Sequence, residues 1–193
     1  KESSAASDVY KRQVMPQVED NIESIFDTAK YLARTYSYGG GCGLTISKLR
    51  PKGAHVRNAA NTTTGAVSFM DLFSLTTSLI GMRGRRGALM LNMDVSHPDI
   101  EDFIDVKNNL EKVTSANISV NINDEFIKAV KEGTDYTLHF QVESTGEVIE
   151  KTIDARALWH KLAKNNWNMA EPGVLFWDRI NSWHITVSYT HLR

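Results

Sequence analysis

The sequence contains a single cysteine, Cys42, among its 193 residues. One cysteine cannot form a disulfide within the chain, and it cannot supply a cysteine-based metal cluster. It also cannot complete a redox reaction that needs two thiols. Because a free cysteine is more often a small buried hydrophobic residue than a nucleophile, we expect no catalytic role for Cys42.

The sequence also lacks an excess of charge of either sign. It has 22 basic and 23 acidic residues and a formal net charge of −1, which argues against the basic surface that general nucleic-acid binding requires. No run of about 18 apolar residues is present, so no membrane-spanning helix is predicted. No n-region and h-region pattern is found at the start of the sequence, so no secretory signal is predicted. We therefore expect a cytoplasmic protein with no nucleic-acid partner and no membrane partner.

The two ends of the chain are expected to be foreign to the protein. Residues 8–13 can be back-translated as GAT GTG TAT AAG AGA CAG, and the reverse complement of that DNA encodes residues 187–191. Both ends are thus compatible with one adapter-like DNA sequence read from opposite strands; the alternative is a coincidence between two polar tails. We expect adapter-derived tails at 1–13 and 186–193, and a native segment at 14–185 that is cut at both ends.

Apolar periodicity predicts alternating helices and strands along the chain. One helical pattern opens at Pro16, and Pro98 fits the first position of another helix. The turn at 144–146 predicts a hairpin between two strands. Further helices are expected at 66–80, 124–132 and 154–165, and strands at 44–46, 88–95, 118–122 and 174–177. This order predicts one α/β unit with a mainly parallel sheet.

Three glycines, Gly39, Gly40 and Gly41, follow the first predicted helix. Glycine lets the backbone approach a ligand closely, so these residues could line a pocket. They could equally end the helix in a tight turn. Their spacing does not match a phosphate-binding loop.

Arginines gather in two predicted loops. Arg50 and Arg57 lie seven residues apart across a Pro/Gly turn, where two guanidinium groups could grip a triphosphate. The second loop, residues 81–87, carries three arginines among glycines and could bind anions or a protein partner. Solvated surface arginines are the alternative for both loops.

The histidines and tryptophans give no sign of a metal or cofactor site. The six histidines lack the spacing of metal ligands, so no metal is expected. His97 is interpreted as part of a helix start. Trp159 and Trp167 are predicted to share one face of a helix and to pack in the core.

Five motifs stand in a fixed order along the chain. They are GGGCGLTISKLRPKGA at 39–54, GAVSFM at 65–70, RRGALM at 85–90, HPDIEDFI at 97–104 and NISV at 117–120. Together they resemble the large-subunit barrel of ribonucleotide reductases, over nearly all of residues 14–185. The sequence is most similar to the adenosylcobalamin-dependent class. The diiron-dependent class is the near alternative, because the two share the barrel that carries most of these motifs.

The resemblance implies an α/β fold, the early part of a ten-stranded α/β barrel that is incomplete here. It implies an oxidoreductase that converts ribonucleotides to deoxyribonucleotides by thiyl-radical chemistry, with adenosylcobalamin as cofactor of the full-length parent. The implied partners are a ribonucleotide substrate, a deoxynucleoside triphosphate effector, a thioredoxin- or glutaredoxin-type reductant and a second copy of the chain. The radical and redox cysteines would lie outside this segment, so we expect no catalytic residue within it and no activity of the isolated chain.

The resemblance also implies roles for particular residues, which fall into an effector set and a substrate set. In the effector set, an acid holds the deoxyribose hydroxyl and two arginines bind the phosphates: Asp20, Arg50 and Arg57. In the substrate set, the backbone faces the ribose and an arginine reaches the base or phosphate: Ser37, Gly40, Gly41 and Arg86. Residues 80–89 match a loop that passes between effector and substrate. The physical chemistry agrees, since arginine suits phosphates and glycine permits close approach.

Two functions of other classes remain open from the residues alone. One is a nucleotide-binding regulatory module without redox activity, and the other is an interaction domain that uses the basic loop. Deoxynucleotide binding that depends on Arg50 and Arg57 would favour a nucleotide site over the interaction domain.

Overall fold

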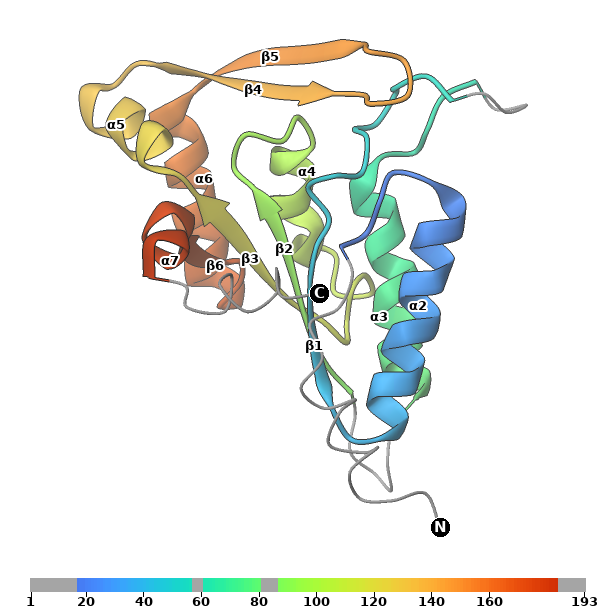
Figure 1. The fold of residues 1–193 in the computed structure, drawn as a ribbon. Helices are drawn as coiled ribbons and strands as arrows, with labels where there is room; N and C mark the ends of the chain where they lie inside the picture. Colours follow the sequence, from blue (N-terminus) through green and yellow to red (C-terminus); the bar gives the residue numbers. More distant parts are fainter. Residues whose placement is uncertain (1–16, 57–60, 81–86, 184–193) are drawn as a thin grey trace.

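A four-stranded parallel sheet forms the centre of the computed structural model, which describes residues 17–56, 61–80 and 87–183 (Figure 1). The strand order is β1-β2-β3-β6, with every neighbouring pair parallel. The strands are β1 (Gly41–Thr45), β2 (Ala88–Asp94), β3 (Asn117–Ile122) and β6 (Gly173–Phe176). Each new strand is therefore added to the same edge of the sheet as the chain proceeds.

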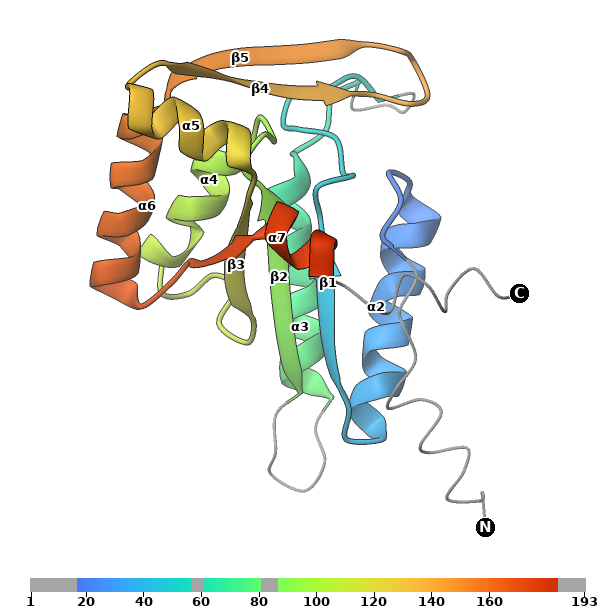
Figure 2. The ribbon, with the colours of Figure 1, turned by 60° about the vertical axis from the view of Figure 1, so that its left-hand side comes forward.

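Helices connect these strands. Because parallel crossovers are almost always right-handed, strands added along one edge bring their helices to the same face of the sheet. The helical segments are α2 (Ile22–Ser37), η1 (Ala66–Phe69), α3 (Met70–Leu79), α4 (Ile100–Asp105), η2 (Val106–Asn108), α5 (Asp124–Glu132), α6 (Ala155–Met169) and α7 (Trp177–Trp183). A sheet of this kind, with α3 and α4 behind it in Figure 2, has the form of part of a barrel wall. None of the described helices combines the length and apolarity that a membrane crossing requires.

An antiparallel hairpin is inserted between α5 and α6. It consists of β4 (Asp135–Gln141) and β5 (Val148–Asp154), and it crosses over the carboxyl end of the parallel sheet (Figures 1 and 2). The His139 N–H donates a hydrogen bond of 2.8 Å to the Ser96 carbonyl, and Phe140 makes an edge contact with His97. The hairpin therefore packs against the turn that follows β2.

The two faces of the sheet differ in polarity. Alternate residues of β1 and β2, such as Leu44 and Leu91, are buried in the core, while Gly43 and Met90 on the opposite face are exposed. Strand β3 is buried on both faces from Ile118 to Ile122, so its side chains do not alternate between core and solvent.

The helix ends follow from local sequence. The Asn123 side chain caps α5 by accepting from the Phe126 N–H at 2.8 Å, and Gly133 closes the helix with a positive φ of 71°. Asp154 caps α6 in the same way, by accepting from the Ala157 N–H at 2.9 Å. The predicted α5, its glycine stop, the hairpin and the α6 cap are confirmed.

The predicted α/β class with a mainly parallel sheet is also confirmed, and the described sheet is not closed into a barrel. Three finer predictions are wrong. The first described helix begins at Ile22, because Asn21 caps it, and not at Pro16. Pro98 precedes the helix that starts at Ile100. Trp167 is 89% exposed and does not pack in the core, whereas Trp159 does pack against the core.

Candidate functional site

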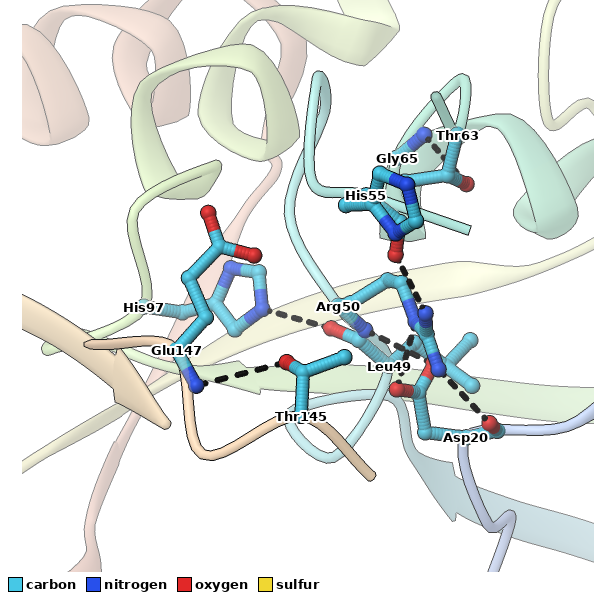
Figure 3. Close-up of polar contacts among 9 residues, drawn as sticks. All are labelled: Asp20, Leu49, Arg50, His55, Thr63, Gly65, His97, Thr145 and Glu147. Atoms are coloured by element: carbon cyan, nitrogen blue, oxygen red, sulfur yellow. Dashed lines mark hydrogen bonds and ion pairs between the residues drawn. The ribbon is translucent and has the colours of Figure 1, made fainter. Parts of the chain in front are cut away.

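Arg50 and Asp20 meet at the end of the sheet where the chain enters α2 (Figure 3). The Arg50 Nε donates to Asp20 Oδ2 at 2.7 Å, and the Arg50 backbone N–H donates to the other carboxylate oxygen at 3.1 Å. The guanidinium also donates from Nη1 to the His55 carbonyl at 2.7 Å. Arg50 thus joins the residues before α2 to the loop that follows β1.

This ion pair lines an open cleft of about 590 Å³. The Arg50 side chain is 14% exposed and the Asp20 side chain 23%, so both remain within reach of a ligand. The cleft lies between the first turn of α2 and the two arms of the loop that follows β1. Its other lining residues are Asn21, Ile22, Glu23, Ile25, Leu49, Val56, Thr62, Thr63, Thr64 and Phe69. Two of the three predicted effector residues therefore lie together, while Arg57 lies outside the described residues.

The predicted substrate residues gather at the opposite end of α2. Ser37 is the last residue of that helix, and its hydroxyl donates to the Arg34 carbonyl at 2.7 Å. Gly39, with a φ of 77°, and Gly40 end the helix by donating their N–H groups to the Tyr36 and Thr35 carbonyls. A Cβ at Gly40 would lie 2.7 Å from the Thr35 methyl group, so the close helix end itself requires this glycine. Arg86 lies outside the described residues.

Gly41 lines a second cleft, of about 540 Å³, together with Cys42 and the start of β2. The glycine triplet therefore does both things considered for it, since it ends a helix and borders a cleft. Cys42 is half-buried and packs against the core. Burial raises the pKa of its thiol, which keeps the thiol protonated and unsuited to nucleophilic attack.

Two residues behind the first cleft were not among the predicted site residues. His97 and Asp99 are buried in the turn between β2 and α4, and both form hydrogen bonds to the loop that holds Arg50. The signal available in the sequence was the motif at 97–104, which contributed to the family resemblance but whose residues were interpreted only as a helix start. In the described part of the chain, no group of three or more histidine, cysteine or acidic residues is arranged to hold a metal.

Comparison with known proteins identifies the family. Residues 13–191 match the family model described as "Ribonucleotide reductase, barrel domain". The chain is 41% identical over 170 residues to the vitamin B12-dependent ribonucleoside-diphosphate reductase of Thermoplasma acidophilum, a match that covers 87% of this chain and 22% of that protein. It is 38% identical over 192 residues to the vitamin B12-dependent ribonucleotide reductase of Streptomyces avermitilis, covering 86% of this chain and 20% of that protein.

A more distant relative is named without reference to vitamin B12. The ribonucleoside-diphosphate reductase subunit alpha of Helicobacter pylori strain 26695 is 27% identical over 187 residues, covering 84% of this chain and 24% of that protein. The chain thus spans about a fifth to a quarter of the length of these relatives. The match to the barrel-domain model over nearly the whole sequence establishes that this chain belongs to the ribonucleotide reductase barrel family.

Proposed function

We propose that this chain is part of a ribonucleotide reductase that converts ribonucleotides to deoxyribonucleotides, and that it carries the specificity-effector site of that enzyme. The observation that carries the proposal is the meeting of Asp20 and Arg50 in one open cleft. The likeness to vitamin B12-dependent relatives, at 38–41% identity against 27% for the Helicobacter pylori protein, supports the adenosylcobalamin-dependent class.

The chemistry of the cleft suits a deoxynucleoside triphosphate. The guanidinium of Arg50 can offer donors to phosphate oxygens, and the Asp20 carboxylate can accept from a deoxyribose hydroxyl. The two groups form an ion pair with each other, which holds both at the rim of the cleft. Arg57 is proposed as the second phosphate ligand, because it lies in the same loop of the sequence.

The substrate is proposed to lie at the other end of α2. There Gly41 opens β1 beside Ala88 of β2 and lines the second cleft with bare backbone. Ser37, Gly40 and Arg86 complete the proposed substrate set. A cleft lined by glycine lets a ribose approach the main chain closely.

The separation of the two sites supports a homodimer. Helix α2 has 16 residues and is therefore about 24 Å long, with the effector residues before its first turn and the substrate residues after its last. Gly87 lies against the ring of Tyr36, in the last turn of α2, so β2 begins at the proposed substrate end. A loop from a second copy, packed antiparallel, could reach the effector that this copy binds.

The surface of α2 and α3 supports the same proposal. These helices contact each other along one side of the molecule (Figure 1). Both carry exposed apolar side chains at helical spacing, namely Ile22 and Phe26 on α2 and Leu75 and Leu79 on α3. Exposed apolar side chains on two neighbouring helices are available for contact with a second copy.

The buried His97 and the cleft at the start of β1 do not themselves fit a cobalamin site. The two ring nitrogens of the buried His97 are both engaged by the backbone. The cleft at the start of β1 offers only the Cys42 sulfur as a metal ligand of the usual kind, and burial keeps that thiol protonated. We therefore assign no cofactor contact to this segment. Adenosylcobalamin and a thioredoxin- or glutaredoxin-type reductant are proposed for the parent enzyme, and the isolated chain, with one cysteine, is proposed to be inactive.

Calorimetric titration of the 193-residue chain with dATP and dTTP tests the effector site. Arg50→Ala should weaken binding about tenfold or more, the loss expected for a charged hydrogen-bonding group. Lys48→Ala is the matched control, because Lys48 pairs with Glu19 nearby and does not line the cleft. Asp20→Asn should remove the preference for dATP over 2′,3′-dideoxyATP. Unchanged binding by a folded Arg50→Ala chain would contradict the proposal.

A further inference from the structure

The loop between β1 and η1 is folded as a short hairpin, and its two arms are paired near their base. The Gly53 N–H donates to the Thr63 carbonyl at 3.0 Å, and the Thr63 N–H donates to the Ala54 carbonyl at 3.0 Å. Farther out, the Val56 N–H donates to the Asn61 carbonyl at 2.9 Å. The described arms of this hairpin, residues 50–56 and 61–65, are called the effector hairpin below. It carries Arg50 at its first position.

A single carboxylate holds both ends of the effector hairpin. The Lys52 N–H lies 3.0 Å from each oxygen of Asp99, and the Ala66 N–H donates to Asp99 Oδ2 at 3.1 Å. Asp99 is only 8% exposed and lies just before α4, more than thirty residues away in sequence from either partner. These are charge-assisted hydrogen bonds in a buried place, and such bonds are stronger than neutral ones.

His97 holds the residue that precedes Arg50. Its Nε2 lies 2.8 Å from the Leu49 carbonyl, and its Nδ1 accepts from the Asp99 N–H at 3.1 Å. Because Nδ1 accepts, the proton of the neutral ring must be on Nε2, where it is donated to Leu49. His97 is 2% exposed and packs edge-on against Phe140 of the hairpin β4–β5, so the ring is fixed from a second side.

Gly65 packs closely against the Asp99 carboxylate. It has a φ of 94°, and a Cβ at this position would lie 2.7 Å from Asp99 Oδ2 and 2.8 Å from the Lys52 nitrogen. No other residue could keep the hairpin this close to Asp99 without displacing one of these groups. The hairpin, the carboxylate and the glycine therefore form one closely packed anchor.

We propose that His97 and Asp99 are positioning residues of the effector site: they fasten both ends of the effector hairpin to the turn after β2 and so set where Arg50 meets the nucleotide. The proposal rests on the proposed function, and it adds the element that fixes the hairpin. Neither residue lines the cleft, so neither touches the effector directly. Their action is on the backbone at Leu49, Lys52 and Ala66.

The anchor also connects the two proposed sites. His97 and Asp99 follow directly on the carboxyl end of β2, while the amino end of β2 pairs with Gly41 at the proposed substrate cleft. Strand β2 is central in the sheet, hydrogen-bonded to β1 and β3. Through His97 and Asp99, the effector hairpin is attached to the same strand that borders the proposed substrate cleft.

The test combines amide hydrogen exchange with nucleotide titration on the full 193-residue chain. In nucleotide-free buffer, Asp99→Asn should speed exchange of the Lys52 and Ala66 amides about tenfold or more, because one of their acceptors becomes an amide donor. The same variant should weaken dATP binding about tenfold. Glu101→Gln is the matched control. Glu101 lies two residues after Asp99 but pairs with Lys151 and Lys161, and not with the effector hairpin. It should change both readouts less than about twofold.

Two substitutions at His97 separate positioning from general stability. His97→Gln keeps an N–H donor for the Leu49 carbonyl and should retain most of the nucleotide affinity, whereas His97→Leu removes the donor and should lose it. Unchanged Lys52 and Ala66 exchange in Asp99→Asn would overturn the proposal. So would equal acceleration at the β3 amides, because that would reveal a residue that only holds the fold together.

The two proposals can fail separately. If the unaltered chain binds neither dATP nor dTTP, the effector assignment fails, while the exchange rates in nucleotide-free buffer still decide whether Asp99 holds the hairpin. If the chain binds nucleotide but Asp99→Asn binds it equally well, the effector site stands and the positioning role is refuted.

Discussion

Gly53 and Gly65 both lie in the effector hairpin with positive φ, but only Gly65 is crowded. A Cβ at Gly53 would meet nothing within 4 Å, whereas a Cβ at Gly65 would meet Asp99 and Lys52 at under 3 Å. Gly53→Ala should therefore cost only the backbone strain, about 1–2 kcal/mol of unfolding free energy. Gly65→Ala adds a steric clash and should cost at least about 1 kcal/mol more than that. Urea unfolding of the two variants measures the difference, and equal losses would contradict the packing around Asp99.

His97 gives the stability of the chain a defined dependence on pH. Burial lowers its pKa below the usual 6.5, against the opposing effect of the carboxylates of Asp99, Asp94 and Asp20. The unfolded chain therefore takes up a proton here as the pH falls below 6.5, while the folded chain does not. Stability is complete above 6.5 and falls below it, by up to about 1.4 kcal/mol per pH unit until the folded-state pKa is reached. Urea unfolding between pH 5.5 and 7.5 should show a smaller acid loss for His97→Gln than for the unaltered chain.

At the residue scale, the family resemblance placed Asp20 and Arg50 in one site, but the sequence did not predict that His97 and Asp99 hold the loop that carries Arg50. Asp20 and Arg50 are thirty positions apart, and only the family resemblance connected them; the 2.7 Å ion pair is in the structure. The roles proposed for them are still predictions. Asp99 was missed because its carboxylate acts on the backbone of Lys52 and Ala66, and a backbone partner leaves no pattern in side-chain types.

Helix α6 offers a matched pair of substitutions at the scale of one element. Leu162 is 3% exposed and belongs to the buried stripe of the helix, whereas Trp167 is 89% exposed. Leu162→Ala should cost about 2–5 kcal/mol of unfolding free energy, and Trp167→Ala should change it by less than about 0.5 kcal/mol. Urea unfolding of both variants tests this, and a loss above about 1 kcal/mol at Trp167 would mean that the indole is covered in solution.

The error at Trp167 has a geometric cause. Eight residues along an α-helix turn the side chain by about 80° beyond two full turns, so Trp159 and Trp167 do not share a face. Trp159 borders the buried stripe, which includes Leu158 and Leu162, and Trp167 lies about 200° from the last buried residue, Asn165. Spacing alone identified the helix, but the direction of its apolar face decides which aromatic residue is covered.

Element boundaries were predictable where the signal is local. Gly133 ends α5 and Asp154 begins α6, each through a contact within four residues. The start of α4 was placed wrongly at Pro98 because the residues before Ile100 are engaged at long range. The His97 ring binds the Leu49 carbonyl and the Asp99 carboxylate binds the effector hairpin, so the chain becomes helical only after these two residues.

At the scale of the whole molecule, the described sheet is a wall with two edges. Strands β2 and β3 have neighbours on both sides, whereas β1 and β6 have a neighbour on one side only among the described residues. An edge strand leaves half of its N–H and carbonyl groups for another strand to pair with. In a closed barrel both edges would be paired, and membership of the barrel family predicts that partners for β1 and β6 come from further parts of a longer protein.

Amide exchange can test that prediction directly. In the 193-residue chain, the amides of β1 and β6 that point away from the sheet should exchange about tenfold faster or more than the central amides of β2 and β3. In a longer chain that carries a complete barrel, the edge amides should become as slow as the central ones, because each then donates to a neighbouring strand. The central amides serve as the internal control, since their partners, such as Leu91 beside Ile118, are already in place. Edge amides that exchange equally fast in both chains would contradict barrel closure through β1 and β6, and would mean that this sheet remains open in the complete protein.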